Sequence, residues 1–345
     1  MSRYVWAMTE LMNRQYYLAT RPAGEPTSAD VPYRDVPVAE PSEGDVVLRN
    51  LYISLDPAIR GWMGDDPNYM EPIALGDAVR SSVIGRVVKS NSADYAVGDV
   101  AMCMGAWERY TTVPAAALNK LDESAGIPLS NFLGVLGPTG LTAYFGLLDV
   151  GKPKAGETVL VSAAAGAVGS VVGQIAKMKG CRVVGMAGTD DKCRWLTDDL
   201  GFDAAINYKT CGDYEAAIRG ACPEGVDVYF DNVGGEILDA ALMCLNKFAR
   251  VAVCGWISTY NVADAPGPVN LWQLVARSAT IQGFVIIDYL ERFPEGIGQL
   301  VTWLLAGDIK FREELVDGLD NVLPTFLRLF DGSNQGKLVI RIPED

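Results

Sequence analysis

Residues 157–169 read Glu157-Thr158-Val159-Leu160-Val161-Ser162-Ala163-Ala164-Ala165-Gly166-Ala167-Val168-Gly169. The first six residues form a largely apolar run typical of a buried strand, and the apolar segment over 167–179 predicts a helix. The turn between them resembles the G-x-G-x-x-G pattern, with Ala164 in place of the first glycine. Such a turn allows a pyrophosphate to approach the backbone and directs a helix N-terminus at it. Glycine-rich strand-to-helix turns also occur without a nucleotide, so the motif alone leaves both interpretations open.

The same strand–helix rhythm continues beyond this turn. Strands are predicted over 182–187, 204–208, 226–231, 250–254 and 280–285, with helices over 191–200 and 213–219. Strands that alternate with helices indicate βαβ units on a parallel sheet. The fold class predicted for 131–299 is therefore α/β, a doubly wound Rossmann domain that binds a dinucleotide, and its position in repeated βαβ units strengthens the interpretation of the glycine-rich turn.

The segments before and after residues 131–299 have a different sequence pattern. Between residues 33 and 117, short β-like runs (45–49, 82–88 and 97–101) are broken by Gly, Pro and Asp, which indicates an antiparallel or barrel-like β domain. A helix over 296–306, an amphipathic segment over 321–330 and a strand over 337–341 follow the Rossmann region. We expect that last strand to rejoin the first sheet. The predicted domains are 1–130 with 300–345 for catalysis and 131–299 for the cofactor, with the active site between them.

Composition narrows the class of protein. The 345 residues are enough for two domains, and 29 Lys and Arg against 43 Asp and Glu give a net charge of −14. This charge argues against nucleic acid and anionic membranes as partners. The first ten residues, Met1 to Glu10, lack the apolar region of a signal peptide, and no stretch indicates a membrane span, so a cytoplasmic location is expected.

The content of cysteine and histidine restricts the chemistry. Seven cysteines without a C-x-x-C pair indicate neither a disulfide framework nor a zinc cluster. Histidine is absent, which excludes Ser-His-Asp and Cys-His catalysis and His-based zinc sites. We therefore predict no metal site, and acid–base chemistry is left to Tyr, Lys, Cys, carboxylates, the cofactor or water.

The choice of cofactor depends on the end of the second predicted strand, at residues 187–194. NAD sites carry a carboxylate there for the ribose 2′-hydroxyl, whereas NADP sites carry small residues and cations for the 2′-phosphate. The segment begins with small residues and contains Lys192, and residues 151–210 hold eight Lys and Arg against six Asp and Glu. This local excess of positive charge favours NADP(H). Lys192 as a solvated helix lysine and Asp190 as an NAD-type ligand remain alternatives.

Several motifs together resemble a known family. The chain is similar to the zinc-independent medium-chain dehydrogenases/reductases, in the branch of prostaglandin reductases and alkenal double-bond reductases. The resemblance covers almost the whole chain and rests on YISLDP at 52–57, LGPTGLTAYFGL at 136–147, AAAGAVG at 163–169, FD at 202–203, NYK at 207–209, DNVGG at 231–235, CGWISTYN at 254–261 and NQGK at 334–337.

The resemblance implies an enzyme that reduces the carbon–carbon double bond of an α,β-unsaturated aldehyde or ketone with NADPH. It also implies roles for individual residues. Tyr260 would hydrogen-bond the substrate carbonyl oxygen and stabilise the enolate formed when hydride reaches the β-carbon. A homodimer paired through the strand near 280–285 is expected as well. The cofactor would be bound by Gly166, Ala167, Val168, Gly169, Lys192, Tyr208, Asn232, Cys254, Gly255, Tyr260, Phe284 and Asn334.

Alternatives remain for both the substrate pocket and the function. Tyr52, Trp62 and Tyr69 are candidates for the substrate pocket, although aromatic residues there are as often ordinary core. Ala58 stands where this branch usually has a larger residue, which leaves the pocket shape open. A quinone reductase that uses NADPH, or a non-catalytic nucleotide-sensing relative, are the rival functions.

Overall fold

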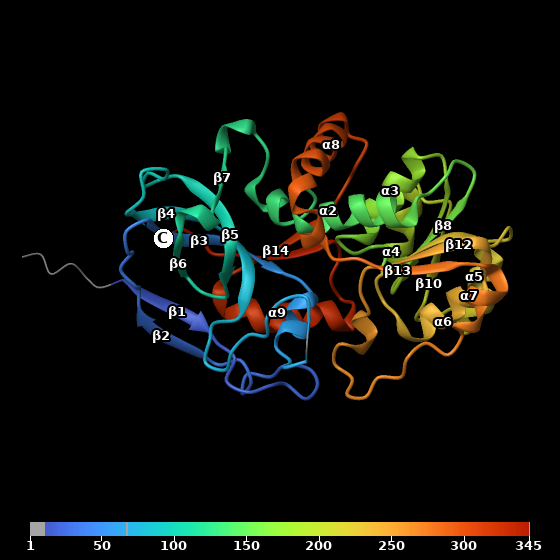
Figure 1. Ribbon diagram of the computed structural model, residues 1–345, viewed down its shortest axis with the longest axis horizontal. Helices are drawn as coiled ribbons and strands as arrows, with labels where there is room; N and C mark the ends of the chain where they lie inside the picture. Colours follow the sequence, from blue (N-terminus) through green and yellow to red (C-terminus); the bar gives the residue numbers. More distant parts are fainter. Residues whose placement is uncertain (1–10, 67, 345) are drawn as a thin grey trace, which may run out of the picture.

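The computed structural model of this chain describes residues 11–66 and 68–344, and the expectation about Met1–Glu10 lies outside them. Two sheets dominate the molecule and lie at opposite ends of its long axis (Figure 1). One is parallel and has six strands, and the other is mostly antiparallel and has seven. No helix in the described part of the chain is long and apolar enough to cross a membrane.

The six-stranded sheet has the order β10-β9-β8-β11-β12-β13, and every neighbouring pair in it is parallel. The first strand, β8, therefore lies at the centre of the sheet. Later strands are added on one side of β8 as far as β10 and then on the other side from β11 onward, which is the Rossmann arrangement. The predicted α/β class is thereby confirmed. The strands are β8 (Thr158–Val161), β9 (Arg182–Ala187), β10 (Ala204–Asn207), β11 (Val226–Asp231), β12 (Leu245–Val253) and β13 (Thr280–Gly283).

Helices cover both faces of this sheet, because its central strands are apolar on both sides. Val159 and Val161 of β8 pack in one core with α2, α3 and α8, whereas Leu160 faces a second core with α5 and α6. The helices are α2 (Pro138–Phe145), α3 (Gly169–Met178), α4 (Asp190–Arg194), α5 (Tyr214–Ala221), α6 (Gly235–Met243), α7 (Trp272–Arg277) and α8 (Phe293–Ala306). A wider helical turn, Trp195–Asp199, extends α4, and another, Gly146–Gly151, extends α2.

The other sheet has the order β14-β15-β3-β4-β5-β7, with β6 paired to β3. The C-terminal strand β15 pairs antiparallel with β3, so the expectation that it rejoins the first sheet is confirmed. Strand β14, which pairs parallel with β15, was not predicted from the sequence. The strands are β3 (Asp45–Leu55), β4 (Arg80–Ser90), β5 (Val100–Ala106), β6 (Tyr110–Pro114), β7 (Asn119–Leu121), β14 (Glu313–Asp317) and β15 (Lys337–Arg341), and a separate hairpin pairs β1 (Met12–Tyr16) with β2 (Tyr33–Pro37).

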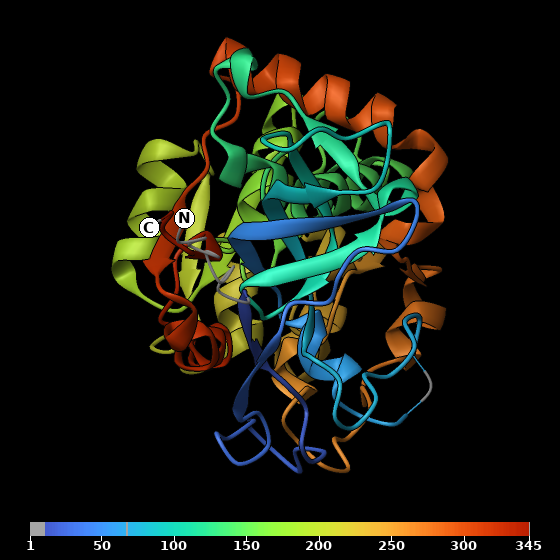
Figure 2. The same cartoon turned by 90° about the vertical axis from the view of Figure 1, so that its left-hand side faces the viewer.

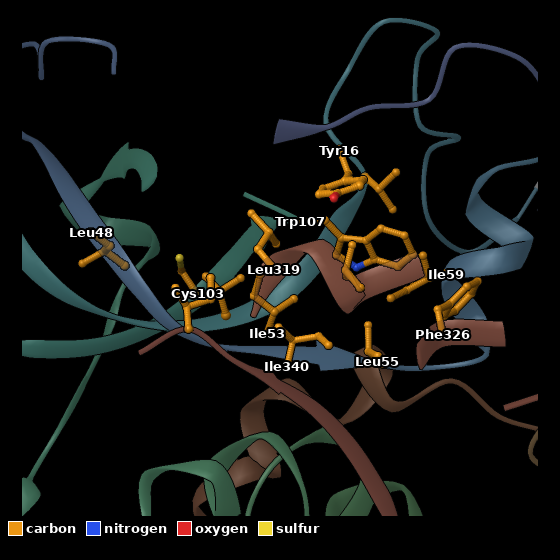
Figure 3. Close-up of a cluster of buried hydrophobic side chains, with 14 of the residues drawn as sticks. Tyr16, Leu48, Ile53, Leu55, Ile59, Cys103, Trp107, Leu319, Phe326 and Ile340 are labelled. Carbon is orange, nitrogen blue, oxygen red and sulfur yellow. The ribbon is translucent and has the colours of Figure 1, made fainter. Parts of the chain in front are cut away.

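The core of this part forms between the sheet and two helices, α1 (Ala58–Trp62) and α9 (Val322–Asp331). Figure 3 shows Trp107 near Ile59 and Phe326, with Ile53 of β3 and Ile340 of β15 next to each other in the same cluster. The rings of Trp107 and Phe326 meet edge to face, with centroids 5.2 Å apart. N- and C-terminal segments therefore share one apolar core, and α9 projects from it toward the Rossmann sheet (Figures 1 and 2).

The helix α8 crosses the proposed boundary at residue 300. Its Leu300 is fully buried in the core that contains Leu141 of α2, and so this helix packs against α2 in the core on one face of the Rossmann sheet. The division into 1–130 with 300–345 and 131–299 stays a prediction. Short single-turn segments complete the chain: Ala115–Ala117, Glu123–Ala125, Leu129–Leu133, Ile257–Thr259, Ile286–Arg292 and Leu319–Asn321.

Candidate active site

The glycine-rich turn joins β8 to α3 at the point where the strand order reverses. A Cβ atom on Gly169 would lie 2.5 Å from the carbonyl oxygen of Ala163, so the turn accepts only glycine there. The amide of Gly166 donates to that same carbonyl oxygen. The amides of Ala167, Val168 and Gly169 have no backbone acceptor among the described residues, and no side chain caps the helix. Unpaired N–H groups at a helix N-terminus fit a pyrophosphate.

The two residues predicted for the 2′-phosphate, Lys192 in α4 after β9 and Tyr208 directly after β10, lie close together. The Nζ atom of Lys192 donates to the carbonyl oxygen of Gly332 at 2.7 Å. The hydroxyl of Tyr208 lies so close to Gly188 and Gly332 that a Cβ atom on either would approach it within 2.8 Å and 3.2 Å, respectively. Burial lowers the pKa of Lys192, and the nearby Lys209 lowers it further. The structure therefore brings Lys192 and Tyr208 to one place.

Asp190 lies beside this group but is engaged elsewhere. Asn207 donates from Nδ2 to its Oδ1 at 2.7 Å. The residue also begins α4, whose N-terminus favours a negative charge. Local hydrogen bonding therefore accounts for this carboxylate without a ribose.

Asn232 sits at the switch point between β8 and β11. Its backbone amide donates to Oγ of Ser162 at 2.9 Å, and its side-chain Nδ2 donates to the carbonyl oxygen of Ser162 at 2.7 Å. These two bonds fix Asn232 at the carboxyl ends of both strands, where ligands bind in doubly wound sheets.

A buried carboxylate organises the loop that follows. Asp231 is fully buried and accepts hydrogen bonds from the Tyr229 hydroxyl, from the backbone amides that follow it and from Nε1 of Trp256. Burial raises its pKa, although the amide of Gly234 and the hydroxyl of Tyr229 oppose the shift. The bond to Trp256, 3.1 Å long, holds the loop that starts at Cys254 against β11. No role was predicted for Asp231 from the sequence, although a carboxylate that ends an apolar strand is a usable signal.

The predicted catalytic residue lies within this loop. Its hydroxyl faces Gly255, because a Cβ atom there would lie 2.8 Å from the Tyr260 oxygen. Burial raises the pKa of Tyr260 to about 12, and Cys254 and Tyr69 contribute to the increase. A phenol with this pKa is protonated at neutral pH and can donate a hydrogen bond to an oxygen that gains negative charge. Cys254 itself has a pKa raised to about 12 by burial, so it is a neutral thiol.

Two further predicted cofactor residues line the same edge. The ring of Phe284, directly after β13, lies against Gly146 and Phe230, with the two phenylalanine centroids 6.1 Å apart. Asn334 donates to the carbonyl oxygen of Gly336, whose amide donates to Ala165 in the glycine-rich turn. The C-terminal segment therefore contacts the turn directly.

The three candidate pocket residues separate into two places. The rings of Trp62 and Tyr69 meet edge to face with centroids 6.4 Å apart, and Tyr69 influences the pKa of Tyr260. Tyr52 instead packs with Ile84 and Leu133 in a cluster of its own. The structure does not bring Tyr52 together with the other two, because alternate residues of β3 face opposite sides of the sheet.

The described residues contain no group of three or more Cys, Asp or Glu side chains that could hold a metal ion. Among the functional residues that sequence reasoning missed, Arg60 of α1 stands out. It is buried and donates to Asn261, next to Tyr260. No sequence signal reveals this contact, because 201 residues separate the two.

The chain is similar in sequence and in fold to known oxidoreductases. Residues 14–121 match the family described as N-terminal domain of oxidoreductase, and residues 167–303 match the family described as zinc-binding dehydrogenase. The chain is 49% identical to a putative NADP-dependent oxidoreductase of Bacillus subtilis (96% of this chain, 98% of the relative) and 44% identical to the NADPH-dependent curcumin reductase of Escherichia coli, with the same coverage. The crystal structure of CurA from Vibrio vulnificus in complex with NADPH superposes with a TM-score of 0.91 at 40% identity, covering 96% of this chain and all of that one.

The fold and the site define an oxidoreductase that uses a dinucleotide. The chain belongs to the medium-chain dehydrogenases/reductases, in the branch of prostaglandin reductases and alkenal double-bond reductases. The predicted family and fold class are therefore confirmed.

Proposed function

We propose that this protein reduces the carbon–carbon double bond of α,β-unsaturated aldehydes and ketones with NADPH. The observation that supports this most is the Tyr260 hydroxyl, with its pKa raised to about 12 by burial, in the loop 254–261 at the carboxyl edge of the Rossmann sheet. Lys192 and Tyr208, which we assign to the 2′-phosphate, lie together in the same domain. The curcumin reductase and the NADP-dependent oxidoreductase among the relatives support both the reaction and the cofactor.

The residues present fit the cofactor. The unpaired amides of 167–169 would hold the pyrophosphate, and Lys192 with Tyr208 the 2′-phosphate. Asn232, Cys254, Gly255, Phe284 and Asn334 would line the remainder of the dinucleotide. NADPH, when bound, supplies the hydride for the β-carbon of the substrate.

Negative charge then develops on the substrate carbonyl oxygen. The Tyr260 hydroxyl donates a hydrogen bond to that oxygen and so stabilises the enolate. Protonation of the α-carbon by water or by Tyr260 completes the reduction. Trp62 and Tyr69 supply apolar surface for the substrate, and Tyr52 is left outside this proposal because it packs elsewhere.

We also propose a homodimer that works in the cytoplasm. The edge strand β13 has no second strand partner among the described residues. Beside it, Val269, Trp272 and Val275 are exposed to 78%, 71% and 64%. A free sheet edge with exposed apolar side chains fits pairing with a second copy, which would continue the sheet across a two-fold axis.

Steady-state assays of NADPH consumption test the function. Enals and enones should support turnover, and the product should be the saturated carbonyl compound. Turnover of quinones alone would favour the quinone reductase, and binding of NADPH without turnover of any acceptor would favour a non-catalytic relative.

A further inference from the structure

Arg60 lies between the two sheets, on the helix α1. Its Nε donates to Oδ1 of Asn261 at 2.9 Å and to the carbonyl oxygen of Gly24 at 3.1 Å. Its Nη2 donates to the carbonyl oxygens of Pro22 and Gly24, at 2.9 Å and 3.0 Å. One guanidinium group thus joins α1, the turn at 22–24 and the loop that carries Tyr260. Figures 1 and 2 show the chain around residues 20–30 beside the segment that follows this loop.

The chemistry of this contact is unusual for a buried cation. Only 8% of Arg60 is exposed, yet no carboxylate among the described residues hydrogen-bonds it. Burial lowers its pKa, and Asp30 opposes that shift from a distance. Buried charges are normally paired, so a guanidinium that is neutralised only by amide and carbonyl dipoles is costly. The forked geometry of arginine, which reaches two segments at once, offers a reason for its presence.

The loop around Tyr260 needs support at this side. It is well fixed at its start, where Trp256 donates to Asp231 and Ser258 to Val233. Beyond that point the amide of Tyr260 makes only a long bond of 3.4 Å, to Ile257. The Trp256 backbone contacts the Tyr260 phenol from within the same loop, whereas Arg60 reaches the loop from another element, through its bond to Asn261.

We propose that Arg60 is a positioning residue, which holds Asn261 so that the Tyr260 hydroxyl faces the reacting carbonyl group; this inference rests on the proposed function. The hydrogen bond from Arg60 ends on the side chain of Asn261, the residue next to Tyr260. The influence of the guanidinium on the phenol therefore passes through the backbone of Asn261.

Two variants and a control test the proposal. Arg60→Gln and Asn261→Ala each remove the contact, and each should slow single-turnover hydride transfer from NADPH to an enone by about five- to fifty-fold. The Kd for NADPH should stay within about two-fold of wild type, because the phosphate contacts lie elsewhere. Arg21→Gln is the matched control. Arg21 donates to the carbonyl oxygens of Met63 and Ile73 near the same helix, but not to the loop, so its loss should leave the rate near wild type.

A double-mutant cycle with Tyr260→Phe separates positioning from general destabilisation. If Arg60 acts through the hydroxyl, Asn261→Ala should slow Tyr260→Phe much less than it slows the wild type. Additive losses in the cycle, or a wild-type rate in Asn261→Ala while Tyr260→Phe is slow, would overturn the inference and leave the proposed function intact. A wild-type rate in Tyr260→Phe would overturn the proposed mechanism and the inference with it. Should Arg60→Gln fail to fold, Asn261→Ala decides the result.

Discussion

Lys192 donates a hydrogen bond from its ammonium group to the carbonyl oxygen of Gly332, at the C-terminal end of α9. Lys209 makes the matching contact to the carbonyl oxygen of Asp331, at 3.1 Å. Both cations therefore lie at the negative end of a helix dipole, which partly offsets the cost of burying Lys192. They also link the Rossmann sheet to the C-terminal segment. The hydrogen bond to Gly332 thus fixes Lys192 beside Tyr208, where a 2′-phosphate would bind.

Replacement of Lys192 tests the choice of cofactor. Lys192→Ala should weaken binding of NADPH by roughly 1.5–3 kcal/mol, because a charge-assisted contact is lost, and should hardly change binding of NADH. Titration calorimetry with both cofactors measures this. Lys247→Ala, which removes an exposed lysine of β12, is the control for net charge. Equal losses for both cofactors would contradict the assignment and favour Asp190 as a ribose ligand.

Replacement of Gly169 tests the turn. A Cβ atom there would lie 2.5 Å from the Ala163 oxygen and 2.8 Å from the Ala164 Cα, and both neighbours are backbone. We therefore expect Gly169→Ala to lower the free energy of unfolding by more than about 1 kcal/mol and to weaken both NADPH and NADH, since the pyrophosphate site shifts. Gly220→Ala in α5 meets no atom within 4 Å and should be neutral or stabilising. Chemical denaturation of both variants gives the comparison, and full NADPH affinity in Gly169→Ala would argue against the turn as a phosphate site.

The pH dependence of stability should reveal a buried carboxyl group. Glu108 accepts hydrogen bonds from Asn13, Gln15 and Thr111, and burial raises its pKa above the ordinary 4.5. The folded state then holds this proton more tightly than the unfolded chain does. The stabilisation that the protonated Glu108 contributes is therefore fully present below pH 4.5, and it is lost as the pH rises through the raised pKa of the folded state.

Glu108→Gln removes that dependence. Relative to wild type, the variant should gain stability as the pH rises above about 4.5, by about 1.4 kcal/mol for each unit by which the pKa is raised. Urea unfolding at a series of pH values measures the difference, with the exposed Glu40→Gln as control. A constant difference between variant and wild type across the series would show that Glu108 does not titrate differently on folding.

The oligomeric state can be tested at the exposed apolar surface beside β13. Trp272→Glu together with Val275→Glu places two charges on side chains that are 71% and 64% exposed in the single chain. If a second copy covers them, sedimentation equilibrium should show monomers for this variant and dimers for the wild type. Leu75→Glu, at an exposed residue far from the strand, should leave the dimer unchanged. A monomeric wild type would refute the dimer.

The sequence predicted the Rossmann sheet well because each strand and helix follows a local pattern of apolar residues. The predicted strand 182–187 is β9 residue for residue, and the C-terminal strand 337–341 is β15. Strand β14 was missed, since Glu313–Asp317 carries three acids in five residues and gains its place from pairing with β15. Partners of this kind, and the contact of Arg60 with Asn261, depend on chain segments that meet only after folding. Tyr52 illustrates the same limit. It was predicted to line the substrate pocket, but its side chain lies on the other face of β3.

The proposed mechanism depends most on the Tyr260 hydroxyl. Tyr260→Phe keeps the ring and removes the donor, which is used mainly in the transition state. The rate constant for hydride transfer should therefore fall by roughly ten- to a thousand-fold, while the Kd for NADPH stays nearly constant. Because the pKa of Tyr260 is raised to about 12, the hydroxyl keeps its proton at neutral pH. Ionisation of Tyr260 should therefore not slow hydride transfer below about pH 11. Tyr69→Phe, at the phenol that contributes to the raised pKa of Tyr260, separates loss of any phenol from loss of this one, and it should slow the reaction much less. Stopped-flow measurement of NADPH oxidation with an enone in excess reports the step directly. Hydride transfer at the wild-type rate in Tyr260→Phe would show that this side chain only packs against Gly255.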